Sequence, residues 1–175
     1  MNTLLYIVIA LVLLIVILAL IAPKSYAVSR EIVIDKPISE VYNYLKFIKN
    51  QDHWSPWQER DPDMKKTSTG TDGEVGFISA WESDHKQVGS GEQELLGLKE
   101  NEEISTHLRF LKPFKSESDA YIRVNEANGG TKVTWGFSGN NKFPMSIMML
   151  FMNMDKAVGG DFEQGLSKLK KVLEN

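Results

Sequence analysis

Residues 104–138 read ISTHLRFLKPFKSESDAYIRVNEANGGTKVTWGFS, and this stretch decides the fold. Apolar and polar residues alternate in it, as in strands with one buried face, over three runs: 104–111, 118–125 and 131–138. Lys112-Pro113 and Asn128-Gly129-Gly130 separate these runs with residues that favour tight turns. Because short turns join antiparallel neighbours, the stretch predicts a β-meander.

Residues on the N-terminal side of this stretch extend the predicted sheet. Strand patterns also occur in three earlier segments: 28–34, 75–83 and 87–98. Residues 38–48 carry apolar side chains at helical spacing directly after Pro37, which predicts a short amphipathic helix. Residues 50–63 are expected to form a loop that carries two tryptophans.

The last run shows which face of the sheet is buried. Val133, Trp135 and Phe137 lie on one side of it, whereas Lys132 and Thr134 lie on the other. One apolar and one polar face are expected of an antiparallel sheet that is covered on one side only. The cover must be the C-terminal segment, which has the long helical pattern that remains.

Between Pro144 and Leu173 the apolar residues recur at steps of three and four, which predicts one amphipathic helix. The register of this stripe places Asp155 and Gly159 on the same inward face as the apolar residues. Gly159-Gly160 weakens a helix by roughly 1 kcal/mol per glycine relative to alanine. We therefore expect a kink or break near this glycine pair.

The segment from Leu4 to Ala22 contains no charged side chain. As a helix it spans roughly 28 Å, close to the roughly 30 Å of a bilayer's hydrocarbon core, so it predicts a single-pass membrane anchor. A cleaved signal peptide is the alternative, because Ser25-Tyr26-Ala27 offers small residues at a suitable spacing. The anchor is favoured because Met1-Asn2-Thr3 lacks Lys and Arg and the apolar run exceeds the usual length of about 7–15 residues.

The predicted organisation is an anchor at residues 1–23, a linker at 24–27 and one soluble domain at 28–175, a common domain size. The cations nearest to the span all follow it: Lys24, Arg30 and Lys36. The positive-inside tendency therefore favours a cytoplasmic soluble domain.

Charge and composition exclude several kinds of site. The net charge is −3, and neither a basic run nor a Gly-rich phosphate loop occurs, so nucleic acid is not an expected partner. The chain has no cysteine, which excludes disulfides and thiolate chemistry. The three histidines are far apart and lack metal-ligand spacing, so neither a metal nor a cofactor is expected.

Four stretches, by their order and spacing, resemble a known family: 34–37 (IDKP), 53–57 (HWSPW), 131–135 (TKVTW) and 154–166 (MDKAVGGDFEQGL). The chain resembles the polyketide cyclase/dehydrase-like branch of the START-like, helix-grip superfamily, also called SRPBCC, over residues 28–174. The resemblance implies an α+β helix-grip fold, in which a curved antiparallel sheet of about seven strands wraps around a long C-terminal helix. It also implies a cavity between sheet and helix that often holds a hydrophobic ligand, although the family is functionally broad.

The resemblance directs attention to residues that could line such a cavity. Trp54 and Trp57 are candidates for its aromatic lip, with an indole N–H as hydrogen-bond donor, or they seal the end of the core. The methionines of residues 145–154 form an adaptable cavity wall, plain core packing or a membrane contact. The candidate ligand-binding residues are Trp54, Trp57, Phe77, Trp81, Leu108, Ile122, Trp135, Met148, Met152 and Asp155.

Asp155 is the one candidate for catalysis. A carboxyl group on an apolar face has its pKa raised by desolvation unless a cation or several N–H donors hold it. Such a group could exchange a proton with a ligand carbonyl or orient a ligand. The alternatives are that Asp155 caps the helix or pairs with a lysine or arginine.

Three functional hypotheses follow from these residues. The first is a membrane-anchored module that binds a hydrophobic small molecule or lipid between sheet and helix. The second is a cyclase- or dehydratase-like enzyme that uses Asp155 as acid and base. The third is a protein-interaction module whose cavity has collapsed.

Overall fold

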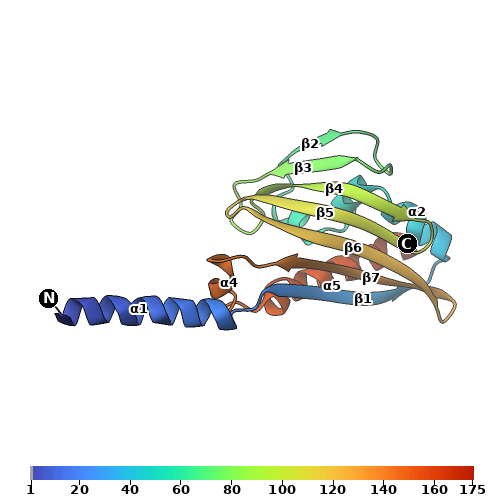
Figure 1. Cartoon of the computed structure of the whole chain (residues 1–175). Coiled ribbons are helices and arrows are strands. Elements are labelled where there is room, and N and C mark those ends of the chain that lie inside the picture. The colour runs from blue at the N-terminus through green and yellow to red at the C-terminus, as the bar shows by residue number, and fades with distance from the viewer. Residues whose placement is uncertain (1) are drawn as a thin grey trace.

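The computed structural model describes residues 2–175, and Figure 1 shows their arrangement. The strands are β1 (Ser25–Ile34), β2 (Lys65–Thr69), β3 (Ile78–Glu82), β4 (Ser90–Lys99), β5 (Glu103–Lys112), β6 (Ser116–Ala127) and β7 (Gly130–Asn140). The helices are α1 (Asn2–Ile21), α2 (Ile38–Leu45), the 3₁₀ helix η1 (Ile48–His53), α3 (Pro56–Arg60), α4 (Met145–Met148) and α5 (Met154–Glu174).

The strands form one seven-stranded antiparallel sheet in the order β1-β7-β6-β5-β4-β3-β2. The meander expected at residues 104–138 is confirmed as β5, β6 and β7. β1 pairs with β7 along its whole length and begins at Ser25 rather than Val28, so most of the expected linker is strand. β2 has no counterpart in the sequence prediction, because its five residues are polar and exposed and show no alternation.

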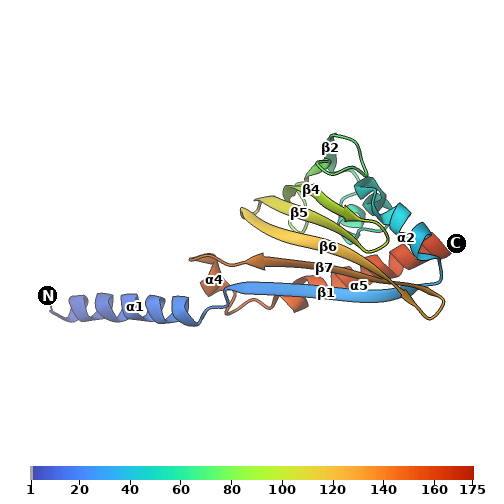
Figure 2. The ribbon, with the colours of Figure 1, turned by 45° about the vertical axis from the view of Figure 1, so that its right-hand side comes forward.

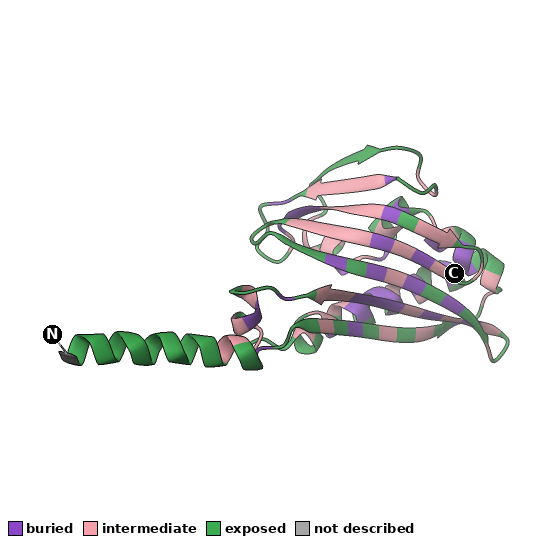
Figure 3. Ribbon diagram, in the orientation of Figure 1, coloured by how far each residue is buried: buried purple, intermediate pink, exposed green. Residues whose placement is uncertain are grey.

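Helix α5 packs across β1 and β7 and covers one face of the sheet, which we call the inner face (Figure 2). Ile122, Val133 and Trp135 are buried on this face, and Phe162 and Leu166 complete the core from α5. Figure 3 shows the resulting alternation of buried and exposed residues along the central strands. The α+β helix-grip architecture expected from the resemblance is confirmed.

The opposite, outer face is polar, as the alternation predicts. Arg109 on β5 donates hydrogen bonds to the carboxylates of Glu92 and Glu94 on β4 at 2.5 and 2.6 Å. Arg123 on β6 donates to Glu103 on β5 at 2.6 Å. These ion pairs are solvent-exposed or partly exposed, so each adds little stability, and the outer face is held chiefly by its backbone ladder.

The C-terminal segment differs from the single kinked helix that the sequence predicts. The helix is interrupted between α4 and α5, where the side chain of Asn153 caps α5 by accepting a hydrogen bond from the backbone N–H of Lys156 at 3.1 Å. Helix α5 then runs without a break through Gly159 and Gly160. The expected kink at the glycine pair is therefore wrong, because packing against the sheet outweighs the low helix propensity of glycine.

Helix α1 stands away from the sheet and is exposed almost throughout (Figure 3). Residues Thr3–Ile21 form one helix long and apolar enough to cross a membrane, with a mean hydropathy of 3.6. Because none of this span is buried against the rest of the protein, the fold itself does not account for its apolar character. A membrane anchor and a signal sequence both fit this helix.

Candidate functional site

Four aromatic side chains fill the space between the inner face and α5, level with the middle of β7. The ring of Trp135 on β7 stacks on that of Phe162 on α5 with centroids 4.2 Å apart. Trp54 meets Trp135 edge-on at 4.9 Å, and Trp57 meets Trp135 and Phe162 edge-on at 5.8 and 6.2 Å. Stacked and edge-to-face pairs stabilise packing, so this aromatic cluster (Trp54, Trp57, Trp135 and Phe162) holds α5 against the sheet.

Two short helices position the tryptophans that precede β2. Trp54 directly follows η1, and α3 begins at Pro56, whose restricted φ suits the first turn of a helix. Arg60 at the end of α3 donates two hydrogen bonds to the carboxylate of Asp161 on α5, at 2.9 and 2.5 Å. This segment is therefore more ordered than the loop that the sequence predicts at residues 50–63.

The indole N–H of Trp54 has no hydrogen-bond partner within residues 2–175, although the side chain is only 1% exposed. Buried donors are normally paired, and leaving one unpaired costs about 1–3 kcal/mol. The neighbouring Trp57 is only half-buried, so the aromatic cluster reaches the surface on that side. An oxygen atom of a ligand that reached the Trp54 N–H would remove the cost.

Beyond the aromatic cluster, the inner face of β3, β4 and β5 is only partly covered. Trp81 on β3 and Leu108 and Phe110 on β5 are half-buried, and the rings of Trp81 and Phe110 meet edge-on with centroids 6.0 Å apart. On the same face, the side chain of Gln93 donates a hydrogen bond to the Thr106 hydroxyl at 3.1 Å. We call this surface the inner strip; it is apolar with few polar groups, which suits a hydrophobic ligand.

The structure brings several of the sequence-predicted ligand residues together. Trp54, Trp57 and Trp135 meet in the aromatic cluster, and Ile122 on β6 lies directly opposite Trp135 in the sheet register. Trp81 and Leu108 belong to the inner strip. Phe77, which is 1% exposed, is part of the packed core instead.

Met148 and Met152 lie outside this arrangement. Their exposed fractions are 43% and 44%, and they belong to α4 and the segment that links it to α5. The prediction that one helical stripe turns them toward the sheet is wrong, because the helix is interrupted between them and α5.

Asp155 also lies outside the apolar core, at the edge of the sheet where it meets Arg30 of β1. Its carboxylate accepts hydrogen bonds from the Arg30 guanidinium at 2.7 and 3.0 Å, and 56% of its side chain is exposed. Arg30 also donates to Glu163 at 2.6 Å. The hydrogen bonds and charge of Arg30 lower the pKa of Asp155 from its ordinary value, the opposite of the rise expected for a catalytic acid in an apolar cavity. The inward placement of Asp155 is thus corrected, and the alternative of a pairing with an arginine is confirmed.

Arg30 is not among the residues predicted from the sequence to form the site, although the strand pattern contains a signal for it. Arg30 has the same strand parity as Val28 and Ile32, so the alternation that predicts a buried face also places this guanidinium on the inner side of β1. Gly159 makes room for it, since a Cβ at Gly159 would lie 2.2 Å from Arg30 Nη2. A charged residue at an inward position of a strand indicates an ion pair across to the covering helix.

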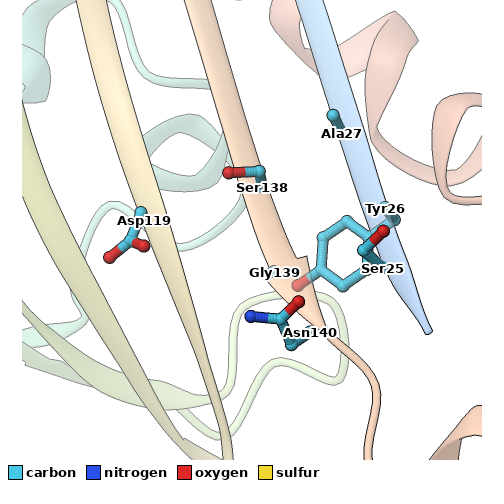
Figure 4. Close-up of a pocket in the computed structure, with 7 residues that line it drawn as sticks. All are labelled: Ser25, Tyr26, Ala27, Asp119, Ser138, Gly139 and Asn140. Carbon is cyan, nitrogen blue, oxygen red and sulfur yellow. The ribbon is translucent and has the colours of Figure 1, made fainter.

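Two surface hollows occur away from the inner strip. One, of about 360 Å³, lies at the α1 end of β1 and β7, and Figure 4 shows Tyr26, Ser138 and Asp119 among its lining side chains. The other, of about 460 Å³, lies beside the β6–β7 turn at the opposite end of the sheet. Neither lies between the sheet and α5.

Among residues 2–175, no group of three or more His, Asp or Glu side chains is placed to hold a metal ion. His107 lies on the outer face and has acidic neighbours. Its Nδ1 lies 2.7 Å from the Asp119 carboxylate. It has no route to the inner strip through the sheet, because alternate residues of a strand point to opposite faces.

Comparison with protein families adds to this geometry. The profile of the family described as polyketide cyclase / dehydrase and lipid transport matches residues 26–174. Comparison with curated protein sequences gives no significant match.

Many solved structures share the fold, and three illustrate the likeness. The Aha1 dimer from Colwellia psychrerythraea is 12% identical, with a TM-score of 0.58 over 85% of this chain and 96% of that one. A structure of an uncharacterised protein from Rhizobium leguminosarum is 13% identical, with a TM-score of 0.61 over 86% and 95%. DynU16, from the dynemicin biosynthetic locus, is 13% identical, with a TM-score of 0.55 over 85% of this chain and 47% of that one. At these identities the likeness concerns the fold alone.

Proposed function

The chain belongs to the polyketide cyclase/dehydrase and lipid transport family, and on that premise we propose that it binds a hydrophobic small molecule or lipid along the inner strip, beside a membrane to which α1 anchors it. Family membership supports the coarser statement, a hydrophobic-ligand or cyclase-like role. The location of the site, its residues and the anchoring are our proposal.

Two observations carry the proposal: an incompletely covered apolar surface and an unpaired buried donor, both on the inner side of the sheet. Trp81, Leu108 and Phe110 keep part of their apolar surface accessible, and Trp54 offers an N–H without an acceptor. Covering apolar surface yields about 25 cal/mol per Å² before ordering costs. The N–H would then set the orientation of a ligand by donating to one of its oxygen atoms, which lipids and polyketides both carry.

Helix α1 supports the anchoring part of the proposal. Its span is apolar and none of it is buried within residues 2–175, and the matched family region begins only after it. We retain an anchor at residues 1–23, and we place the start of the domain at Ser25, where β1 begins. The cations that follow the span continue to favour a cytoplasmic domain.

A protein-interaction module is the second candidate. It is favoured by the tight packing of the aromatic cluster and by the two hollows, which both lie elsewhere on the surface. The enzyme hypothesis that relied on Asp155 is not retained, because that carboxylate is paired with Arg30 in solvent.

Native mass spectrometry of the full chain in detergent, followed by extraction and identification of bound molecules, tests the proposal. A stoichiometric hydrophobic adduct that also raises the melting temperature is expected. Trp54→Phe should weaken binding roughly two- to tenfold through loss of one hydrogen bond. Trp135→Phe is the matched control, since it replaces an indole of the same cluster by the smaller phenyl ring and leaves the Trp54 N–H in place.

Absence of any adduct, together with no rise in melting temperature on addition of lipid extract, would contradict ligand binding and favour the interaction module. Equal losses of affinity in Trp54→Phe and Trp135→Phe would show that the Trp54 N–H plays no special part.

A further inference from the structure

Exposed apolar side chains gather in two segments of the soluble domain. Outside α1, six large hydrophobic residues with high exposure lie either at the β5–β6 turn or between β7 and α5: Leu111, Phe114, Phe143, Met148, Phe151 and Met152. Phe151 is 83% exposed and Phe114 60%. We call these six residues the apolar end. Single exposed hydrophobic residues are common on proteins, but a group of this size marks an interaction surface.

Both segments lie at the end of the sheet where α1 joins the domain. Figures 1 and 2 both show the β5–β6 turn and α4 at the end of the sheet from which α1 extends, with α4 next to α1 and the β5–β6 turn across β7 and β6 from it. Helix α4 contacts α1. The backbone N–H of Asn141 donates to the carbonyl of Lys24 at 2.8 Å, which ties the segment before α4 to the junction between α1 and β1. The segment between β7 and α5 therefore lies beside the end of α1, and the sheet holds the β5–β6 turn at the same end.

The segments that carry the apolar end are basic, although acidic side chains lie near them: Lys112 is paired with Glu82 at 3.5 Å. Residues 22–27, 111–115 and 140–154 contain no Asp or Glu, in a chain whose net charge is −3. The same ranges contain four exposed lysines: Lys24, Lys112, Lys115 and Lys142. Apolar side chains with lysines nearby suit an anionic membrane, because the apolar groups enter the headgroup layer and the lysines are attracted to the anionic lipids.

We propose that the apolar end docks the domain on the bilayer that α1 crosses, with the rings of Phe114 and Phe151 among the lipid headgroups and the lysines on anionic phosphates. The inference rests on the anchoring role proposed for α1. Docking also has a consequence for the inner strip: Phe110 immediately precedes Leu111 of the apolar end, so the strip's end faces the lipid surface. A hydrophobic ligand could then pass between bilayer and protein without crossing water.

Because the chain contains no cysteine, single-cysteine labelling tests the proposal directly. Phe114→Cys and Phe151→Cys would be labelled with the fluorophore NBD in the full chain, reconstituted in phosphatidylcholine vesicles with and without phosphatidylserine. Val75→Cys, in the β2–β3 turn at the far end of the sheet, is the matched exposed control (Figure 1). Val12→Cys reports the insertion of α1. Quenching by lipids brominated on their acyl chains measures contact with the bilayer.

The labels at residues 12, 114 and 151 should be quenched, and the label at residue 75 should not. Quenching at residues 114 and 151 should increase with phosphatidylserine, and Lys115→Gln with Lys142→Gln should reduce that increase. A quenched label at residue 12 with unquenched labels at 114 and 151 would overturn docking and leave the anchor intact. An unquenched label at residue 12 would overturn both. An NBD blue shift at 114 and 151 without quenching would show burial against protein, a second copy or another partner, and would also overturn docking.

Discussion

Two glycines of α5 should respond in opposite ways to replacement by alanine, although both lie inside the same helix. At Gly160 an added Cβ meets nothing within 4 Å, so Gly160→Ala gains the full difference in helix propensity, about 1 kcal/mol. At Gly165 the added Cβ lies 2.8 Å from the ring of Trp135 and 3.2 Å from Pro56. Overpacking of a filled core costs about 1–3 kcal/mol, so Gly165→Ala has a net effect from about zero to 2 kcal/mol destabilising.

Thermal unfolding is measured for both variants and the parent, as full chains in the same detergent. It is monitored by the near-ultraviolet circular dichroism of the tryptophans. For a domain of this size, about 1 kcal/mol corresponds to a change of about 2–4 °C in Tm, so Gly160→Ala should melt that much higher. Gly165→Ala should melt below Gly160→Ala by the overpacking cost. Equal Tm increases in the two variants would refute the packing of α5 against Trp135 and Pro56, on which the aromatic cluster depends.

Three further substitutions test other contacts. Asp155→Asn should lower Tm at neutral pH, because Arg30 lowers the pKa of Asp155 below its ordinary value of 3.8. The ion pair therefore stabilises the folded state above pH 3.8, and this contribution is lost as the pH falls through the folded-state pKa. The Tm values of parent and variant should then converge in strong acid. A Tm difference that persists there would contradict this. Arg60→Ala leaves Asp161 unpaired and should lower the free energy of unfolding in urea by about 1–3 kcal/mol. Phe162→Ala should lower it by about 3–5 kcal/mol, and a loss under 1 kcal/mol would contradict the stacked packing.

The alternation in the strands allowed most of the sheet to be predicted. Val133, Trp135 and Phe137 identified the buried face of β7, and the polar turns identified its neighbours, because a period of two survives in any half-buried strand. β2 could not be found in this way, since Lys65–Thr69 is held by backbone pairing to β3 and carries no apolar face. The short helices η1 and α3 likewise depend on packing against α5.

The candidate site was predicted only in part. Tryptophans 54, 57 and 135 could be expected to gather, because large aromatic side chains seek the core. Helical periodicity failed for Met148 and Met152, because it assumes that one helix continues from them into α5. Asp155 does lie in the first turn of α5, but its side chain is exposed and paired with Arg30. The pairing of Asp155 with Arg30 joins residues 125 positions apart, which no local pattern contains.

The sequence by itself determined the apolar span, the antiparallel sheet with one buried face and the helical cover, because each follows from a short-range pattern of hydrophobicity. Tertiary structure alone decided where the covering helix begins, which way Asp155 points, that the Trp54 N–H is left unpaired, and that Phe114 and Phe151 share one end of the domain with α1. These outcomes depend on contacts between residues distant in the chain, whose energies exceed the local preferences of the segments that make them.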